Sequence, residues 1–295
     1  MDQLELDSKF VGTPLKEYSC QINWREIMNY AAAIDDNNEF YFDDEQKDGI
    51  VAPPMFAVAT TWPIIENLPE YLITDDFPLE VMMTTVHYSE HLKIYRLMKS
   101  GDEITIKGEI VAMMPHRAGT HVILCLEAVD NKNEPVYTQY HGGMLRGVEC
   151  IGGGKGEENL PRIHIEKEVS PPLWEEIITI DSLRSYIYDG CSGITFPIHT
   201  SREFAHQVGL PGIIMQGTAT LAYAVKGITN REAGKNPLKV KEIACRFTSI
   251  VKPGTEIRLV LNNRIKIENE TEFFFTVYNE REKRAISDGY IQLKE

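Results

Sequence analysis

The chain repeats one order of structural elements twice, and this internal repeat constrains its fold more than any other feature. In each half a turn, ending at Gly101 or at Gly254, introduces residues rich in β-branched and aromatic side chains, which are typical of strands. The corresponding strand-like segments are 102–110 with 255–261, 120–126 with 271–277, and 136–137 with 285–286. The sequence therefore predicts two copies of one α+β domain.

Each half also begins with a short helix. Residues 23–35 place Trp24, Ile27, Met28 and Ala31 at helical spacing behind Asn23, a residue that caps helix starts well. In the second half, residues 181–187 repeat the pattern, with Asp181 as the cap and with Leu183, Tyr186 and Ile187 on one face. A second apolar, helix-like stretch follows in each half, at 55–60 and at 218–225.

Composition excludes several classes of protein. The 295 residues carry a net charge of −14, and such an acidic chain lacks the basic face that binds nucleic acid. No run of about 18 apolar residues could span a membrane, and the first residues lack the pattern of a signal peptide, so we expect a cytoplasmic protein without a membrane partner. Five cysteines without a close pair indicate reduced thiols.

The histidines do not predict a metal site. His87, His91, His116, His121 and His141 show no spacing typical of metal ligands along the chain. We therefore expect neither a metal nor a cofactor.

Between the first helix and the apolar stretch, each half carries a related motif. The first motif, residues 34–41, reads Ile-Asp-Asp-Asn-Asn-Glu-Phe-Tyr, and the second motif, residues 192–199, reads Ser-Gly-Ile-Thr-Phe-Pro-Ile-His. The second motif resembles the Ser-Gly-Asp-x-Asn-Pro-Leu/Ile-His signature of (R)-specific enoyl-CoA hydratases, the MaoC-like dehydratases of the hotdog fold. It keeps the histidine as His199 but has Ile194 in place of the aspartate. The first motif keeps Asp36 and Asn38 at the acidic and amide positions but has Tyr41 in place of the histidine.

This resemblance implies a double hotdog, in which two curved antiparallel sheets each wrap around a long helix, as in a dimer of single hotdog domains. It implies an N-terminal hotdog domain over residues 1–150, similar to the FAS1-like and MaoC-like dehydratases and expected to bind substrate. A linker over 151–175 and a C-terminal MaoC-like domain over 176–295, with the active site, complete the expected division. The expected substrate is an acyl-CoA, and the expected partner is a second copy of the chain or another metabolic enzyme.

The resemblance also assigns roles to the second half. It makes His199 a general acid and base and makes the backbone N–H of Gly217 the donor to the thioester oxygen, since N–H groups at a helix start favour negative charge. The corresponding residue of the first half is Pro54, which has no N–H to donate. The residues expected around the substrate are Thr195, Phe196, Gln216, Thr218, Tyr41, Asp36 and Asn38.

Simpler roles stay open for three residues of the first motif. Asp36 and Asn38 also suit a turn, in which their side chains accept hydrogen bonds from nearby backbone N–H groups. Tyr41 is a poor base near neutral pH, because a phenol has a pKa near 10, and it suits the lining of a tunnel or the core better. Asp189, at the end of the second-half helix, is a candidate replacement for the missing aspartate.

Three functions are therefore open. The first is a hydratase or dehydratase that interconverts an enoyl-CoA and a 3-hydroxyacyl-CoA. The second is a catalytically impaired protein that binds an acyl-CoA or supports a partner subunit. The third is a thioesterase, since other hotdog enzymes hydrolyse thioesters.

Overall fold

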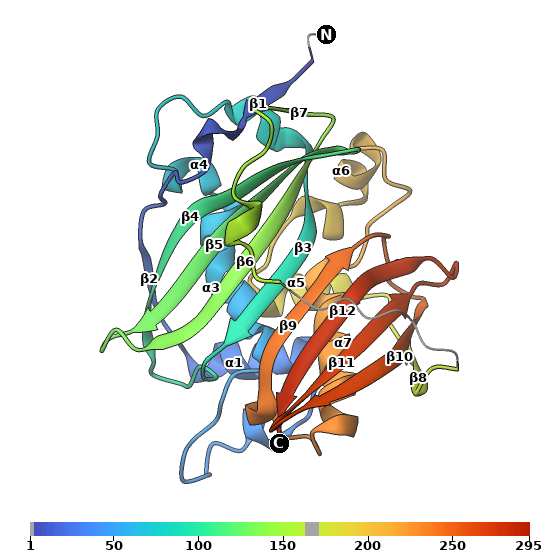
Figure 1. Cartoon of the computed structure of the whole chain (residues 1–295). Coiled ribbons are helices and arrows are strands. Elements are labelled where there is room, and N and C mark those ends of the chain that lie inside the picture. The colour runs from blue at the N-terminus through green and yellow to red at the C-terminus, as the bar shows by residue number, and fades with distance from the viewer. Residues whose placement is uncertain (1–2, 163–170) are drawn as a thin grey trace.

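One ten-stranded antiparallel sheet forms the centre of the computed structural model, which describes residues 3–162 and 171–295 (Figure 1). Its strand order is β2-β4-β5-β6-β3-β9-β12-β11-β10-β8. The first half contributes β2 (Tyr18–Gln21), β3 (Thr85–Ile94), β4 (Glu103–His116), β5 (Gly119–Asp130) and β6 (Pro135–Arg146). The second half contributes β8 (Trp174–Thr179), β9 (Val240–Phe247), β10 (Glu256–Ile267), β11 (Glu270–Tyr278) and β12 (Arg284–Lys294). A separate parallel pair joins β1 (Glu5–Asp7) to β7 (Glu149–Ile151).

The two halves join where β3 pairs with β9 at the middle of the sheet (Figure 1). Glu90 lies opposite Cys245, and Leu92 lies opposite Ile243. Each half contributes five consecutive strands of the order, so the predicted double hotdog fold is confirmed.

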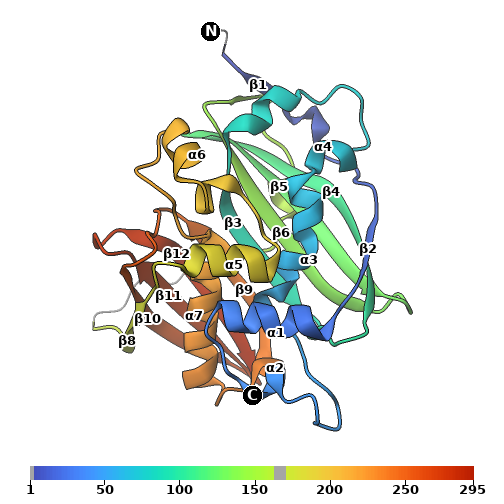
Figure 2. The same ribbon diagram turned by 180° about the vertical axis from the view of Figure 1, so that it is seen from behind.

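The main helices lie together on one face of this sheet (Figure 2). The helices are α1 (Trp24–Ala33), α2 (Glu39–Phe42), α3 (Ala57–Glu66), α4 (Leu68–Tyr71), α5 (Arg184–Ser192), α6 (Arg202–Gln207) and α7 (Gly217–Glu232). The longest is α7, and most of its side chains are buried, as expected for the helix that a hotdog sheet wraps. No helix in the described part of the chain is long and apolar enough to cross a membrane.

The helix predicted at 23–35 is confirmed as α1. Asn23 accepts a hydrogen bond from the backbone N–H of Arg25, and Glu26 accepts one from the N–H of Asn23, which completes a capping box. Ile27 is fully buried as predicted, but Trp24 is 52% exposed, so the prediction that it faces the core was wrong.

The predicted apolar face of α5 was also wrong. Leu183, Tyr186 and Ile187 are all exposed, and the buried face instead carries Arg184 and Tyr188, among others. Helical spacing located the helix but not its buried side, because α5 packs against α1 through polar contacts.

These polar contacts connect the halves. The hydroxyl groups of Tyr30 on α1 and Tyr188 on α5 lie 3.1 Å apart in the core. The guanidinium of Arg184 donates to the carbonyl oxygen of Ala33 at 3.1 Å and pairs with the carboxylate of Asp35 at 2.7 Å. Tyr188 and Arg184 of the second half thus hold α1 and the residues just after it against α5.

The predicted linker over 151–175 lies partly outside the described residues, and the domain boundaries stay a prediction. Its first part packs against β4: Lys155 exchanges backbone hydrogen bonds with Met113. Gly156 has a φ of 85°, and a Cβ there would lie 2.1 Å from the carbonyl oxygen of Val111. This contact requires glycine.

Candidate active site

His199 lies at the end of a short 3-10 turn, Pro197–His199, that the second motif forms. Its Nδ1 lies 2.8 Å from the carbonyl oxygen of Ile214, and the N–H of Ile214 donates in return to the carbonyl of Ile198 at 3.2 Å. These two bonds fasten the motif to the loop that precedes α7. His199 and Gly217, the two residues predicted to do the chemistry, therefore lie on two loops that are bound to each other.

The same contact fixes the form of the imidazole. A carbonyl oxygen can only accept a hydrogen bond, so Nδ1 of His199 carries the hydrogen and Nε2 keeps a lone pair. Burial lowers the pKa of His199 to about 4, although the bond to Ile214 opposes this change. At neutral pH the side chain is thus an uncharged base with Nε2 as its proton acceptor.

Helix α7 begins at Gly217, as predicted. The N–H groups of a first helical turn have no partner inside the helix, and the side chain of Gln216 at the cap position does not bind them. A Cβ on Gly217 would lie 3.0 Å from the ring of Phe247, so only glycine leaves this helix start open without a shift of that ring. The geometry suits a donor to a developing oxyanion.

Gln216 and Thr218 flank Gly217, but both side chains turn into the protein. The amide nitrogen of Gln216 donates to the carbonyl of Ser185 at 3.1 Å, and the hydroxyl of Thr218 accepts a hydrogen bond from Tyr188 at 3.1 Å. Their contact with substrate stays a prediction. What the structure shows is that they anchor the start of α7 to α5.

The other predicted residues of the second motif lie nearer the surface. Phe196 is exposed, and its ring centre lies 6.5 Å from that of His199. The hydroxyl of Thr195 donates to the carboxylate of Glu66, on α3 of the first half, at 3.1 Å. Ile194, in contrast, is buried in the core, so no carboxylate stands at the family's aspartate position.

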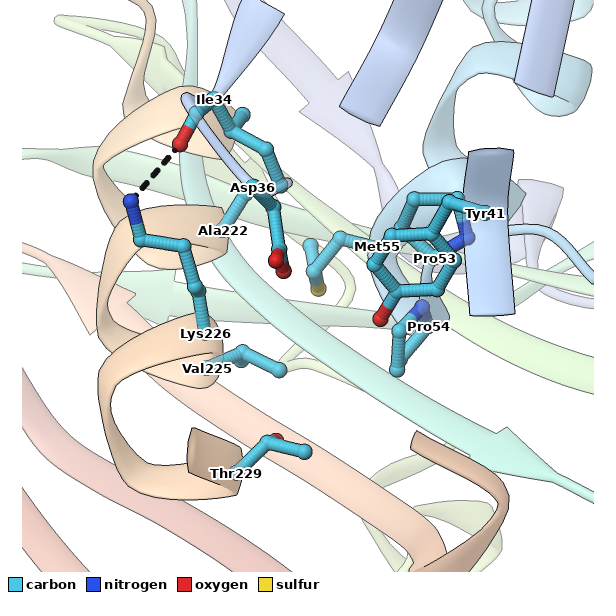
Figure 3. Close-up of a pocket in the computed structure, with 10 residues that line it drawn as sticks. All are labelled: Ile34, Asp36, Tyr41, Pro53, Pro54, Met55, Ala222, Val225, Lys226 and Thr229. Atoms are coloured by element: carbon cyan, nitrogen blue, oxygen red, sulfur yellow. Dashed lines mark hydrogen bonds between the residues drawn. The ribbon is translucent and has the colours of Figure 1, made fainter. Parts of the chain in front are cut away.

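The first motif lines a hollow of its own, which we call the first-half hollow (Figure 3). Its volume of about 10 Å³ is near the minimum for one water molecule. Asp36 and Tyr41 point toward its middle in Figure 3. The lining residues are Ile34, Asp36, Tyr41, Pro53, Pro54 and Met55 from the first half and Ala222, Val225, Lys226 and Thr229 from α7.

Burial and neighbouring charges shift the pKa values of the side chains around the first-half hollow. Burial raises the pKa of Asp36, and the nearby ammonium of Lys226 opposes this rise. Lys226 donates to the backbone carbonyl of Ile34 at 2.9 Å (Figure 3). Burial and the charge of Asp36 raise the pKa of Tyr41 well above its usual value. Tyr41 therefore stays a neutral phenol at neutral pH. It is buried in the core and lines the hollow, and its place in an acyl tunnel stays a prediction.

The proposed turn roles of Asp36 and Asn38 are confirmed. Asp36 accepts a hydrogen bond from the backbone N–H of Asn38, and Asn38 accepts one from the N–H of Phe40. The amide of Asn38 also donates to the carbonyl of Lys235 at 2.6 Å, so it ties the first motif to the second half. Whether either residue touches substrate stays a prediction.

One group of side chains in the described part of the chain could hold a metal ion. The ligand atoms of His87, Glu90 and His141, on β3 and β6, lie within 4.8 Å of one another. Burial raises the pKa of Glu90 to about 7 and lowers that of His87 to about 4. Gln139 donates to one carboxylate oxygen of Glu90 at 3.0 Å, while the other oxygen is buried without a partner among the described residues, and the absence of a metal stays a prediction.

Sequence reasoning missed the side chains that each long helix brings to the opposite half. Lys226 on α7 contacts the first motif, and Glu66 on α3 contacts the second motif. The repeat carried part of the signal, because α3 and α7 follow their motifs in the same order. The two residues are not at matching positions, since Lys226 lies nine positions after Gly217 and Glu66 lies twelve positions after Pro54.

The double hotdog fold, in which the loop of His199 is bound to the loop that precedes α7, is the arrangement expected of a MaoC-like protein. Comparison with known proteins agrees with this assignment. The family profile described as "MaoC like domain" matches residues 166–284, and the profile described as "FAS1-like, dehydratase domain region" matches residues 9–139.

Two relatives match along nearly the whole chain. "Enoyl-CoA hydratase 2, peroxisomal" of Arabidopsis thaliana is 32% identical and covers 95% of this chain and 93% of its own length. "Probable enoyl-CoA hydratase 2" of Dictyostelium discoideum is 23% identical and covers 95% and 94%. This chain belongs to the MaoC-like enoyl-CoA hydratase and 3-hydroxyacyl-thioester dehydratase family, in its double hotdog form.

Solved structures show the same fold. A MaoC-like dehydratase from Phytophthora capsici superposes with a TM-score of 0.83 at 19% identity and covers 97% of this chain and 98% of its own. A Mycobacterium tuberculosis protein described as having a double hotdog fold superposes with a TM-score of 0.58 at 11% identity and covers 95% and 96%.

Proposed function

We propose that this protein is a hydratase or dehydratase that interconverts a trans-2-enoyl-CoA and a 3-hydroxyacyl-CoA. Two full-length relatives are named as enoyl-CoA hydratase 2, which supports both the reaction and the acyl-CoA substrate. The predicted cytoplasmic location and the predicted association with a second copy or another enzyme remain proposals.

The observation that carries the proposal is the uncharged His199, whose loop is bound to the start of α7. In the hydration direction, Nε2 of His199 takes a proton from water while the water oxygen bonds to C3 of the enoyl group. The π electron pair moves to C2 and onto the thioester oxygen, which accepts a hydrogen bond from the N–H of Gly217. The imidazolium then returns its proton to C2. Water is thus added across the double bond, and His199 regains its starting form.

The experiment follows a panel of trans-2-enoyl-CoAs and 3-hydroxyacyl-CoAs by absorbance of the conjugated thioester and by release of free thiol. We expect interconversion without thiol release. His199→Ala should lower kcat by about 10² to 10⁴, the usual contribution of a positioned acid or base. Unchanged hydration by His199→Ala would refute the assignment of the base.

The other functions give different results in this experiment. Release of free thiol would indicate a thioesterase. Binding of acyl-CoA without any turnover would indicate an impaired binding protein or partner subunit, a function that the apolar Ile194 in the aspartate position favours.

A further inference from the structure

The second motif lacks the family's carboxylate. Because the two halves are repeats, the residues that line the first-half hollow indicate which residues surround the second motif. The two halves correspond: Tyr30 meets Tyr188 across the middle, and Pro54 corresponds to Gly217. In the first half, Thr229 of α7 lines the hollow beside the first motif. Thr229 lies twelve positions after Gly217. The residue twelve positions after Pro54, at the equivalent place on α3, is Glu66.

The contacts show that each long helix reaches the motif of the opposite half. Lys226 of α7 reaches the first motif, and Glu66 of α3 reaches the second motif and accepts a hydrogen bond from Thr195, the residue after Ile194. Glu66 is exposed, so one of its carboxylate oxygens can serve the motif while the other stays open to a ligand or water.

Two further polar groups lie on the helices that carry or approach Glu66. The indole N–H of Trp62, one turn before Glu66 on α3, is buried and has no hydrogen-bond partner among the described residues. One carboxylate oxygen of Asp189 is also buried without a partner there. Burial raises the pKa of Asp189, and the charge of Glu66 adds to this rise, which places the two carboxyl groups near each other. Buried polar groups without partners are rare in proteins and are common where a ligand or water binds.

We propose that Glu66, carried by helix α3 of the first half, supplies the carboxylate that the second motif lost at Ile194. This inference rests on the proposed function. Glu66 accepts a hydrogen bond from the second O–H of the water whose first proton goes to Nε2 of His199. It thereby directs the water's lone pair toward C3, and the proton balance of the reaction is unchanged because Glu66 itself exchanges no proton. The active site is then built from both halves.

The test compares kcat and KM of the full chain with its Glu66→Gln variant on trans-2-enoyl-CoAs. Glutamine keeps the acceptor for Thr195 and removes the charge, so the fold should survive, as a thermal melt will show. We expect kcat to fall by about 10² or more with little change in KM. The matched control is Glu70→Gln, an exposed glutamate on α4, which should leave both constants unchanged.

A second variant separates catalysis from packing. Thr195→Val removes the hydrogen bond but keeps the carboxylate, so we expect a smaller loss in kcat than for Glu66→Gln. Placing Ile194→Asp in the Glu66→Gln background should recover part of the lost kcat, because it returns a carboxylate to the family position.

The kcat of the Glu66→Gln variant alone decides whether this inference stands. A kcat equal to that of the wild type, together with loss of turnover in His199→Ala, would overturn this inference and leave the proposed function standing. Absence of hydration by the wild-type protein on every enoyl-CoA would overturn both.

Discussion

Replacing Gly217 with proline tests the oxyanion donor directly. Proline has no N–H, but it is well tolerated at the first position of a helix, where that N–H has no partner inside the helix. Gln216 before it has an extended backbone, with φ −60° and ψ 133°, as a residue before proline requires. Gly217 itself does not have a positive φ, so the backbone need not change. The protein already has a proline, Pro54, at the corresponding place in its first half.

The alanine variant separates the expected loss from the effect of an added Cβ. Both alanine and proline put a Cβ at 3.0 to 3.3 Å from the ring atoms of Phe247, and proline adds Cγ and Cδ as well. Only proline removes the N–H. Loss of one oxyanion donor typically lowers kcat by about 10² to 10³, which corresponds to about 3 to 4 kcal/mol of transition-state stabilisation. We expect this factor between Gly217→Ala and Gly217→Pro.

The assay measures kcat for both variants with one trans-2-enoyl-CoA that the wild type hydrates, and a thermal melt confirms that both fold. Equal kcat values for the alanine and proline variants would refute the donor role of Gly217. A large loss already in Gly217→Ala would show that the fit of Phe247, rather than the N–H, limits the reaction.

Two further predictions concern stability. Burial lowers the pKa of His87, His121 and His199 to about 4 from 6.5, so between these values the unfolded chain binds more protons than the folded one. Stability from these histidines is therefore present above about pH 6.5 and is lost as the pH falls toward 4. Glu90, whose pKa is raised to about 7, opposes this trend, as do Asp36 and Asp189, whose pKa values burial also raises. Urea midpoints should fall between pH 7.5 and pH 5, and a rise would contradict the argument. Arg184→Met should lower the free energy of unfolding by about 2 to 3 kcal/mol in urea titrations, because it leaves the buried carbonyl group of Ala33 without its side-chain donor, and a loss below about 0.5 kcal/mol would refute this.

Most of the fold could be predicted from the sequence, because the residue pattern of the strands away from the centre of the sheet is typical of strands. The segments at 102–110 and 255–261 have apolar residues and turn glycines, and they form β4 and β10 as predicted. The central strand β3 has no such pattern. Its residues Glu90 and His91 are polar, and they are buried where β9 of the second half pairs against them. Such burial depends on the contact between the repeats, which the local pattern of β3 does not encode.

The site could be predicted in part for a similar reason. The motif located His199, and the helix start located Gly217, since both depend on short stretches of chain. Glu66 lies far from the second motif in sequence, and the hydrogen bond with Thr195 exists only because α3 crosses to the opposite half. Aligning the two halves pairs Glu66 with Thr229, which indicates a site only once the structure shows that Thr229 lines the first-half hollow.

The exchange of helices between the halves changes how substitutions in the motifs should be interpreted. In the first half the motif keeps its carboxylate, Asp36, while α7 brings the cation Lys226, which lies near Asp36 and helps keep it ionised. In the second half the motif has lost its carboxylate, while α3 brings Glu66 to the same region. The first-half hollow thus has charges from two independent segments, and the second motif contacts a charge carried by α3. The loss of an acid from one segment therefore does not settle whether the site has an acid. In a double hotdog, the motif of one half and the helix of the other have to be considered together before a site is judged inactive.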